Sequence, residues 1–165
     1  MTSAEEVARS YFAALAARDP DAMAAHWSPD GVDELTGIGI LRGPAEIAGF
    51  FRDVIAAMPD YELVVARVTA NDRVAAVEWR SQGTFSGGPM IGLEPTGRLV
   101  EQRGCDCVEV VDGLIVRNTA YIDGLETARS VGFLPPQDSA VEKLLYGAFN
   151  AATKLRRAVG ASASG

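Results

Sequence analysis

The spacing of hydrophobic residues changes along the chain from a helical period to a strand period. Up to residue 58, apolar side chains recur every three or four positions, and beyond residue 61 they alternate with polar ones. The first pattern predicts helices over residues 3–18, 20–26 and 44–58, with a turn at 28–31 and short strands at 32–36 and 38–41 between the last two. The second pattern predicts strands over residues 61–70, 73–85, 99–111 and 114–122.

This order of elements predicts an α+β fold. Helices followed by a run of antiparallel strands place the helices on one face of a curved antiparallel sheet. The two layers together would enclose a cavity, and such a cavity is the usual ligand site. We expect one domain over residues 1–136.

A further helical pattern follows the strands. A short helix is expected over residues 125–131, and a second apolar stripe covers 139–157. We treat residues 137–165 as a C-terminal helical extension with a flexible tail from residue 160. The apolar stripe must be buried, either as a lid over the mouth of the cavity or against a second subunit.

Composition narrows the possible partners. The chain has 165 residues, 48% of them hydrophobic, and a formal net charge of −7. This favours one globular domain and argues against a nucleic-acid partner. The N-terminal residues lack the features of a signal peptide and no apolar run is long enough for a membrane span, so we expect a cytoplasmic protein.

The chain has few residues that bind metals. It contains two cysteines, Cys105 and Cys107, and a single histidine, His26. A zinc site needs about four ligands, and the spacing C-x-C on one strand is unsuited to a disulfide. We therefore expect no metal, no cofactor and no disulfide.

The hairpin at residues 103–123 carries the candidate chemistry. Its turn at Asp112-Gly113 suits the positive φ angles of a two-residue connection. Counting outward from that turn pairs Asp106 with Thr119 and predicts one sheet face that carries Asp106, Thr119, Tyr121 and Asp123. Carboxylates on an otherwise apolar hairpin indicate either a solvated face or a pocket in which acids transfer protons.

Several segments together resemble a known family. They are SYFAALAARDPDAM, GPAEIAGFF, VEWRSQGTFSG, PTGR, CVEVVDGLIV and YIDGLETARSVGFLPP. Over residues 3–136 the chain resembles the superfamily of ketosteroid isomerase and nuclear transport factor two, and within it the SnoaL-like polyketide cyclases. The resemblance implies a cofactor-free cyclase or isomerase that moves a proton beside a carbonyl in a small hydrophobic or polycyclic substrate. It also implies a cone-shaped curved antiparallel sheet packed on the N-terminal helices around a hydrophobic pocket, and a homodimer.

The resemblance assigns roles to four residues. Asp123, in YID, matches the general acid/base of the cyclases, although the strand segment GCDCVEV lacks their partner histidine. Tyr11 and Asp106 match the tyrosine and the protonated aspartic acid that hold the oxyanion in ketosteroid isomerase. Glu34 falls near the position of that isomerase's base.

Other residues are candidates for substrate contacts, and the function stays open. His26 is a candidate base because imidazole is a common proton acceptor in proteins, and Trp79, Phe85 and Tyr121 are candidate pocket walls. Three alternatives remain: an enzyme, a pocket that binds a small hydrophobic molecule without turnover, and a dimerisation module with a filled cone.

Overall fold

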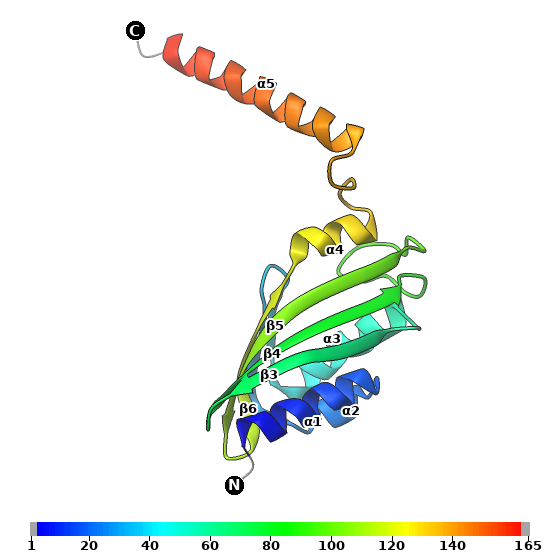
Figure 1. The fold of residues 1–165 in the computed structure, drawn as a ribbon, viewed down its shortest axis with the longest axis vertical. Helices are drawn as coiled ribbons and strands as arrows, with labels where there is room; N and C mark the ends of the chain where they lie inside the picture. The colour runs from blue at the N-terminus through cyan, green and yellow to red at the C-terminus, as the bar shows by residue number, and fades with distance from the viewer. Residues whose placement is uncertain (1–2, 163–165) are drawn as a thin grey trace.

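The protein is a curved sheet with helices along one side and a long helix beyond it (Figure 1). The computed structural model describes residues 3–162. The helices are α1 (Ala4–Ala16), α2 (Pro20–Ala24), α3 (Gly43–Ala57), α4 (Gly124–Val131) and α5 (Ala140–Ser162). The strands are β1 (Trp27–Leu35), β2 (Gly39–Arg42), β3 (Glu62–Ala70), β4 (Val74–Thr84), β5 (Leu99–Val111) and β6 (Leu114–Ile122). The predicted α+β architecture is confirmed.

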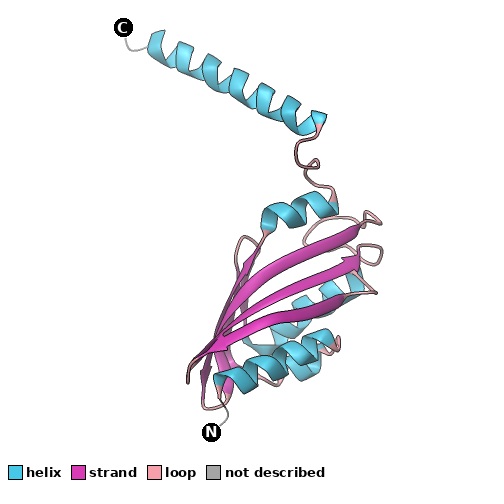
Figure 2. Ribbon diagram, in the orientation of Figure 1, coloured by secondary structure: helices cyan, strands magenta, loops and turns pink. Residues whose placement is uncertain are grey.

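The six strands form one sheet in the order β2-β1-β6-β5-β4-β3. Figure 2 shows the strands in magenta and the helices in cyan. Neighbours pair antiparallel except β1 and β6, which run parallel. The expectation of a wholly antiparallel sheet was therefore wrong at this one pair. The turn expected at residues 28–31 was wrong as well, since β1 continues through it with an irregularity between Trp27 and Val32.

Local sequence signals explain the helix boundaries. Ser3 and Glu6 form a capping box at the start of α1, and the Asp19 side chain caps α2 ahead of Pro20. The inner side of α1 buries Val7, Tyr11 and other apolar residues against the sheet. Each buried Leu, Val or Phe of this kind contributes about 1.5–3 kcal/mol, so packing rather than helix propensity fixes α1 in place.

The turn of the β5–β6 hairpin has the predicted conformation, but the register beyond it does not. Asp112 and Gly113 both have positive φ, of 52° and 80°. The register then shifts by one residue between Glu109 and Val110, because β6 bulges at Val116. Asp106 consequently pairs with Ala120 rather than with Thr119. The predicted common face of Asp106, Thr119, Tyr121 and Asp123 is thus wrong.

The C-terminal segment leaves the body of the protein after α4. Helix α5 stands apart from the sheet and the other helices (Figure 1). It continues through residues 160–162, where a flexible tail was expected, and the rest of that tail lies outside the described residues. Within residues 3–162, no helix is both long and apolar enough to cross a membrane.

Candidate functional site

A cavity lies between the inner face of the sheet and the helices. Its volume is about 370 Å³, within the range of small-molecule sites. The walls are mostly apolar and come from α1, α3, α4, the long strands and the loop after β4. Among the described residues that line the cavity there is no Lys, Arg or His, and Asp106 is the only carboxylate.

A row of polar side chains crosses four neighbouring strands beneath this cavity. The Trp79 indole N–H on β4 donates to Asp106 Oδ1 on β5 at 2.7 Å. The Asn118 amide on β6 donates to Asp106 Oδ2 at 2.7 Å and to Asp33 Oδ1 on β1 at 2.9 Å. The parallel register of β1 and β6 pairs Asp33 directly with Asn118, so one amide joins the two carboxyl groups.

Burial governs the ionisation of these two acids. Asp33 is 0% exposed and Asp106 is 6% exposed. Burial, followed by the charge of Asp106, raises the pKa of Asp33 to about 7. Burial also raises the pKa of Asp106, against the hydrogen bonds from Trp79 and Asn118 that favour its charged form. At neutral pH Asp33 is therefore close to its ionisation equilibrium, and the raised pKa of Asp106 favours proton transfer by its carboxyl group.

Two tyrosines in the cavity wall keep their protons. Burial, reinforced by the charges of Asp33 and Asp106, raises the pKa of Tyr11 well above its ordinary value. Burial also raises the pKa of Tyr61 to about 12. The Tyr11 ring packs edge-on against Phe12 and Trp27, with ring centroids 5.4 and 5.9 Å apart, which holds its orientation. Both hydroxyls are neutral groups that can donate a hydrogen bond to a ligand.

The structure brings three of the predicted site residues together. Tyr11, Trp79 and Asp106 all line the cavity. The alternation of β4 and β5 explains two of them, because Trp79 and Asp106 occupy inward positions of their strands. Tyr11 faces the sheet from the apolar side of α1.

The other predicted substrate contacts lie outside the cavity wall. His26 is held by Ala22 O and Ser10 Oγ, each at 2.8 Å. Glu34 points away from the core and forms an ion pair with Arg117 at 2.7 Å. Phe85 is fully buried in the core, and Tyr121 is 58% exposed because the register shift turns it outward.

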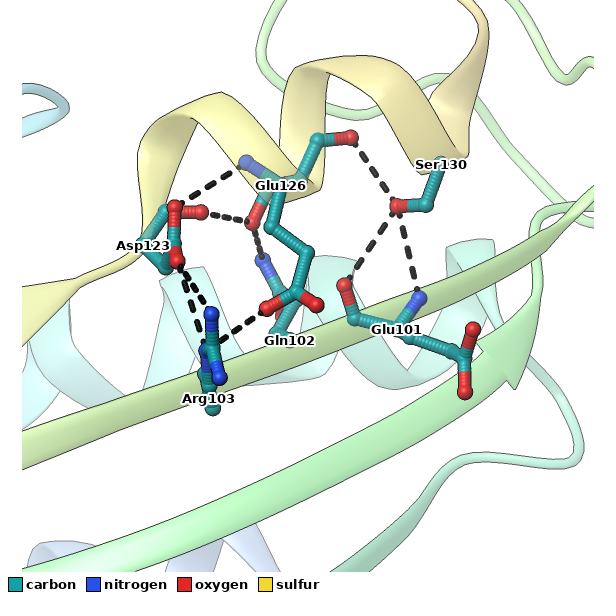
Figure 3. A network of polar contacts seen from close by, with 7 residues as sticks. Glu101, Gln102, Arg103, Asp123, Glu126 and Ser130 are labelled. Carbon is teal, nitrogen blue, oxygen red and sulfur yellow. Dashed lines mark hydrogen bonds and ion pairs between the residues drawn. The ribbon is translucent and has the colours of Figure 1, made fainter. Parts of the chain in front are cut away.

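Asp123 acts structurally at the start of α4 (Figure 3). Its Oδ1 accepts the Glu126 backbone N–H at 3.0 Å, and its Oδ2 pairs with Arg103 at 3.1 Å. These hydrogen bonds lower the pKa of Asp123, and its side chain is not part of the cavity wall. The arrangement is that of a helix cap with a surface ion pair, and its predicted role in proton transfer gains no support from this position.

Sequence reasoning missed Asp33. The resemblance points to the neighbouring Glu34, but Asp33 shares the inward face of β1 with Leu35. Strict alternation backward from Leu35 would have found it. In residues 3–162, no group of three or more His, Cys, Asp or Glu side chains is arranged to hold a metal ion.

The helices, the curved sheet and the cavity between them define a protein of the ketosteroid isomerase and nuclear transport factor two fold class. The chain belongs to the SnoaL-like domain family, whose family model matches residues 8–118. No curated protein matches the sequence significantly.

Solved structures share this fold. AclR, a proposed hydroxylase from Streptomyces galilaeus, is 23% identical, with a TM-score of 0.71 over 93% of this chain and 95% of its own. A proposed polyketide cyclase from Xanthomonas campestris pv. campestris is 25% identical, with a TM-score of 0.67 over 78% of this chain and 96% of its own. An NTF2-like protein from Burkholderia thailandensis E264 is 22% identical, with a TM-score of 0.70 over 82% and 100% of the two chains.

Proposed function

We propose that this protein is a cofactor-free enzyme that moves a proton beside a carbonyl group of a small, uncharged, hydrophobic molecule. The observation that carries the proposal is Asp106, a carboxyl group with a raised pKa in the wall of an otherwise apolar cavity. Membership of the SnoaL-like family and the likeness to a proposed polyketide cyclase support this reaction class.

Asp106 serves as the proton-transfer base in this scheme. Both of its oxygens accept hydrogen bonds from N–H donors, an arrangement that favours the carboxylate over the protonated acid. The resemblance to ketosteroid isomerase implies instead a protonated aspartic acid that donates to the substrate. We favour the role of base for Asp106. Trp79 and Asn118 hold the carboxylate in place, and its raised pKa gives it a higher affinity for a proton than an ordinary aspartate has.

Tyr11 is the hydrogen-bond donor. Proton removal beside a carbonyl places negative charge on the carbonyl oxygen, and a neutral hydroxyl in an apolar cavity stabilises that charge. Tyr11 lines the same cavity as Asp106 and stays protonated across the ordinary pH range. Asp33 does not line the cavity; through Asn118 it positions Asp106 and adjusts its charge.

The proposal is tested by hydrogen–deuterium exchange of small cyclic ketones in D₂O, followed by mass spectrometry. The native protein should accelerate exchange at the carbon beside the carbonyl. Asp106→Asn should reduce the rate by at least about a hundredfold, and Tyr11→Phe by roughly tenfold or more. Asp112→Asn, the same chemical change at the turn of the same hairpin, should leave the rate unchanged.

Asp123→Asn separates this scheme from the cyclase assignment. If Asp123 is the proton-transfer acid, its substitution should abolish exchange and Asp106→Asn should not. Equal exchange by the native protein and Asp106→Asn would refute the role proposed for Asp106.

A second candidate is binding of a small organic cation without turnover. The aromatic residues around Asp106, among them Trp79, Tyr11 and Phe50, form walls that suit cation–π contacts. A ketosteroid isomerase-like protein from Catenulispora acidiphila, 15% identical, has been crystallised with trimethylamine. Micromolar binding of a small quaternary amine, lost in Asp106→Asn and accompanied by no ketone exchange, would favour this function.

A further inference from the structure

Helix α5 exposes an apolar stripe that its own chain does not cover. Val141, Leu145, Leu155 and Val159 are each more than half exposed to solvent. A helix with an apolar stripe normally buries it against another element. The role of this stripe is independent of the reaction proposed for the cavity.

The direction of α5 is fixed by contacts at its first turn. Glu142, a buried residue, pairs with Arg129 of α4 at 2.6 Å and accepts the Asp138 backbone N–H at 2.6 Å. The Tyr146 hydroxyl also donates to Glu142, at 3.1 Å. Because one carboxylate accepts hydrogen bonds from α4, from the preceding loop and from α5 itself, these bonds favour the direction in which α5 stands apart from the sheet and the other helices (Figure 1). The helix is thus unsuited to serve as a lid on its own chain.

The apolar residues of α5 have the spacing of a coiled coil. Val141, Leu145, Ala148, Ala152, Leu155 and Val159 recur at alternating intervals of four and three residues. This is the a/d pattern through which two helices pack side by side. The alanines at the centre allow the two backbones to approach closely.

The same pattern is symmetric about Asn150. Val141 and Val159 lie nine residues on either side of it, Leu145 and Leu155 five, and Ala148 and Ala152 two. In an antiparallel pair of identical helices with its two-fold axis at Asn150, valine would meet valine, leucine leucine and alanine alanine. Self-complementarity of this kind is what a two-fold symmetric interface requires.

The charges favour the same arrangement. The end of the helix carries three basic residues, Lys154, Arg156 and Arg157. An antiparallel pair keeps the two basic ends apart, but a parallel pair would bring them together. Helix α5 has 23 residues and is therefore about 35 Å long, so the two cones would lie at opposite ends of the pair.

From these observations we propose that α5 is a dimerisation helix that pairs antiparallel with α5 of a second copy of this chain. AclR also has a C-terminal extension. Its alignment covers 93% of this chain, and the cone ends near residue 136, so the match includes part of the extension.

Sedimentation of the full chain at micromolar concentrations tests the interface. The native protein should form a dimer, and Leu145→Glu should raise the dissociation constant by roughly tenfold or more because it places a charge in an apolar layer. Asn150→Glu, on the opposite side of the same helix, should leave the dissociation constant unchanged. A native monomer, or a dimer unaffected by Leu145→Glu, would overturn the proposal.

Disulfide trapping tests the direction of the helices. In a background with Cys105→Ser and Cys107→Ser, a mixture of the Leu145→Cys and Leu155→Cys proteins should form a mixed disulfide, while neither protein should cross-link alone. Homodisulfides of each single variant would indicate a parallel pair and overturn the arrangement. Recruitment of monomers through α5 to vesicles of anionic phospholipid would show that a membrane surface, not a second copy, covers the stripe.

Discussion

Asp33 and Asp106 share one amide donor inside the protein, so the protonation of one acid depends on the other. Asp33 makes a hydrogen bond through Oδ1 only, and its Oδ2 is buried without a partner in the described structure. An unpaired oxygen in that position is more costly when charged than when protonated. The pKa of Asp33 near 7 follows from this burial and from the adjacent Asp106.

The stability of the protein should therefore depend on the ionisation of Asp33. Its pKa rises from an ordinary 3.8 to about 7 on folding. Between these values the folded state holds a proton that the unfolded state has released, so this residue's contribution to stability falls as the pH rises from 3.8 to 7. Above pH 7 the full cost is present and amounts to at most about 4 kcal/mol.

Asp33→Asn removes this titration. The free energy of unfolding of the variant, relative to the native protein, should rise between about pH 4 and pH 8, because the native protein alone incurs the cost of ionisation. Urea denaturation at several pH values measures this difference. Asp112→Asn serves as the control and should follow the native pH profile, and a parallel profile for Asp33→Asn would contradict the assignment.

At the scale of the elements, close packing of β4 and β5 fixes the Trp79 indole against Asp106. Gly104 on β5 pairs with Trp79 on β4. A Cβ at position 104 would lie 2.6 Å from the Trp79 ring and 2.7 Å from the Tyr121 backbone oxygen. The ring and the neighbouring strand therefore occupy the space that any other residue would need.

Gly104→Ala should destabilise the protein by about 1–3 kcal/mol and displace the Trp79 ring from Asp106. Chemical denaturation measures the first effect, and tryptophan fluorescence the second. Gly49→Ala makes the same change inside α3, where a Cβ meets nothing within 4 Å, and should be neutral or stabilising by up to about 1 kcal/mol. Equal stabilities of the two variants would show that the sheet adjusts at Gly104 without cost.

The sequence pattern predicted the elements better than it predicted their register. The apolar stripes of α1 and α3 and the alternation of β4 were sufficient to place Tyr11 and Trp79 inside the cone. The bulge at Val116 carries no distinctive residue, so counting from the turn placed Tyr121 and Asp123 on the wrong face. The parallel pairing of β1 with β6 brings together residues 85 positions apart, Asp33 and Asn118, and no local pattern encodes that contact.

At the scale of the whole molecule, both the protein as a whole and the wall of its cavity carry negative charge. The formal net charge is −7, and α5 carries a basic end. Asp106 contributes the only formal charge among the described residues of the cavity wall. An anionic ligand would thus approach a negative surface and enter an apolar cavity without a cation to pair with it.

The charge of a ligand should consequently decide whether it binds. A neutral polycyclic ketone should raise the melting temperature, by the equivalent of about 2.7 kcal/mol when present at a hundred times its dissociation constant. The same ring system bearing a carboxylate should give no shift, because burial of its charge beside Asp106 is unfavourable. Differential scanning fluorimetry of the full chain compares the two ligands directly. Asp106→Asn should reduce the difference between the melting-temperature shifts caused by the two ligands. Equal shifts with the native protein would contradict charge selection by the cavity.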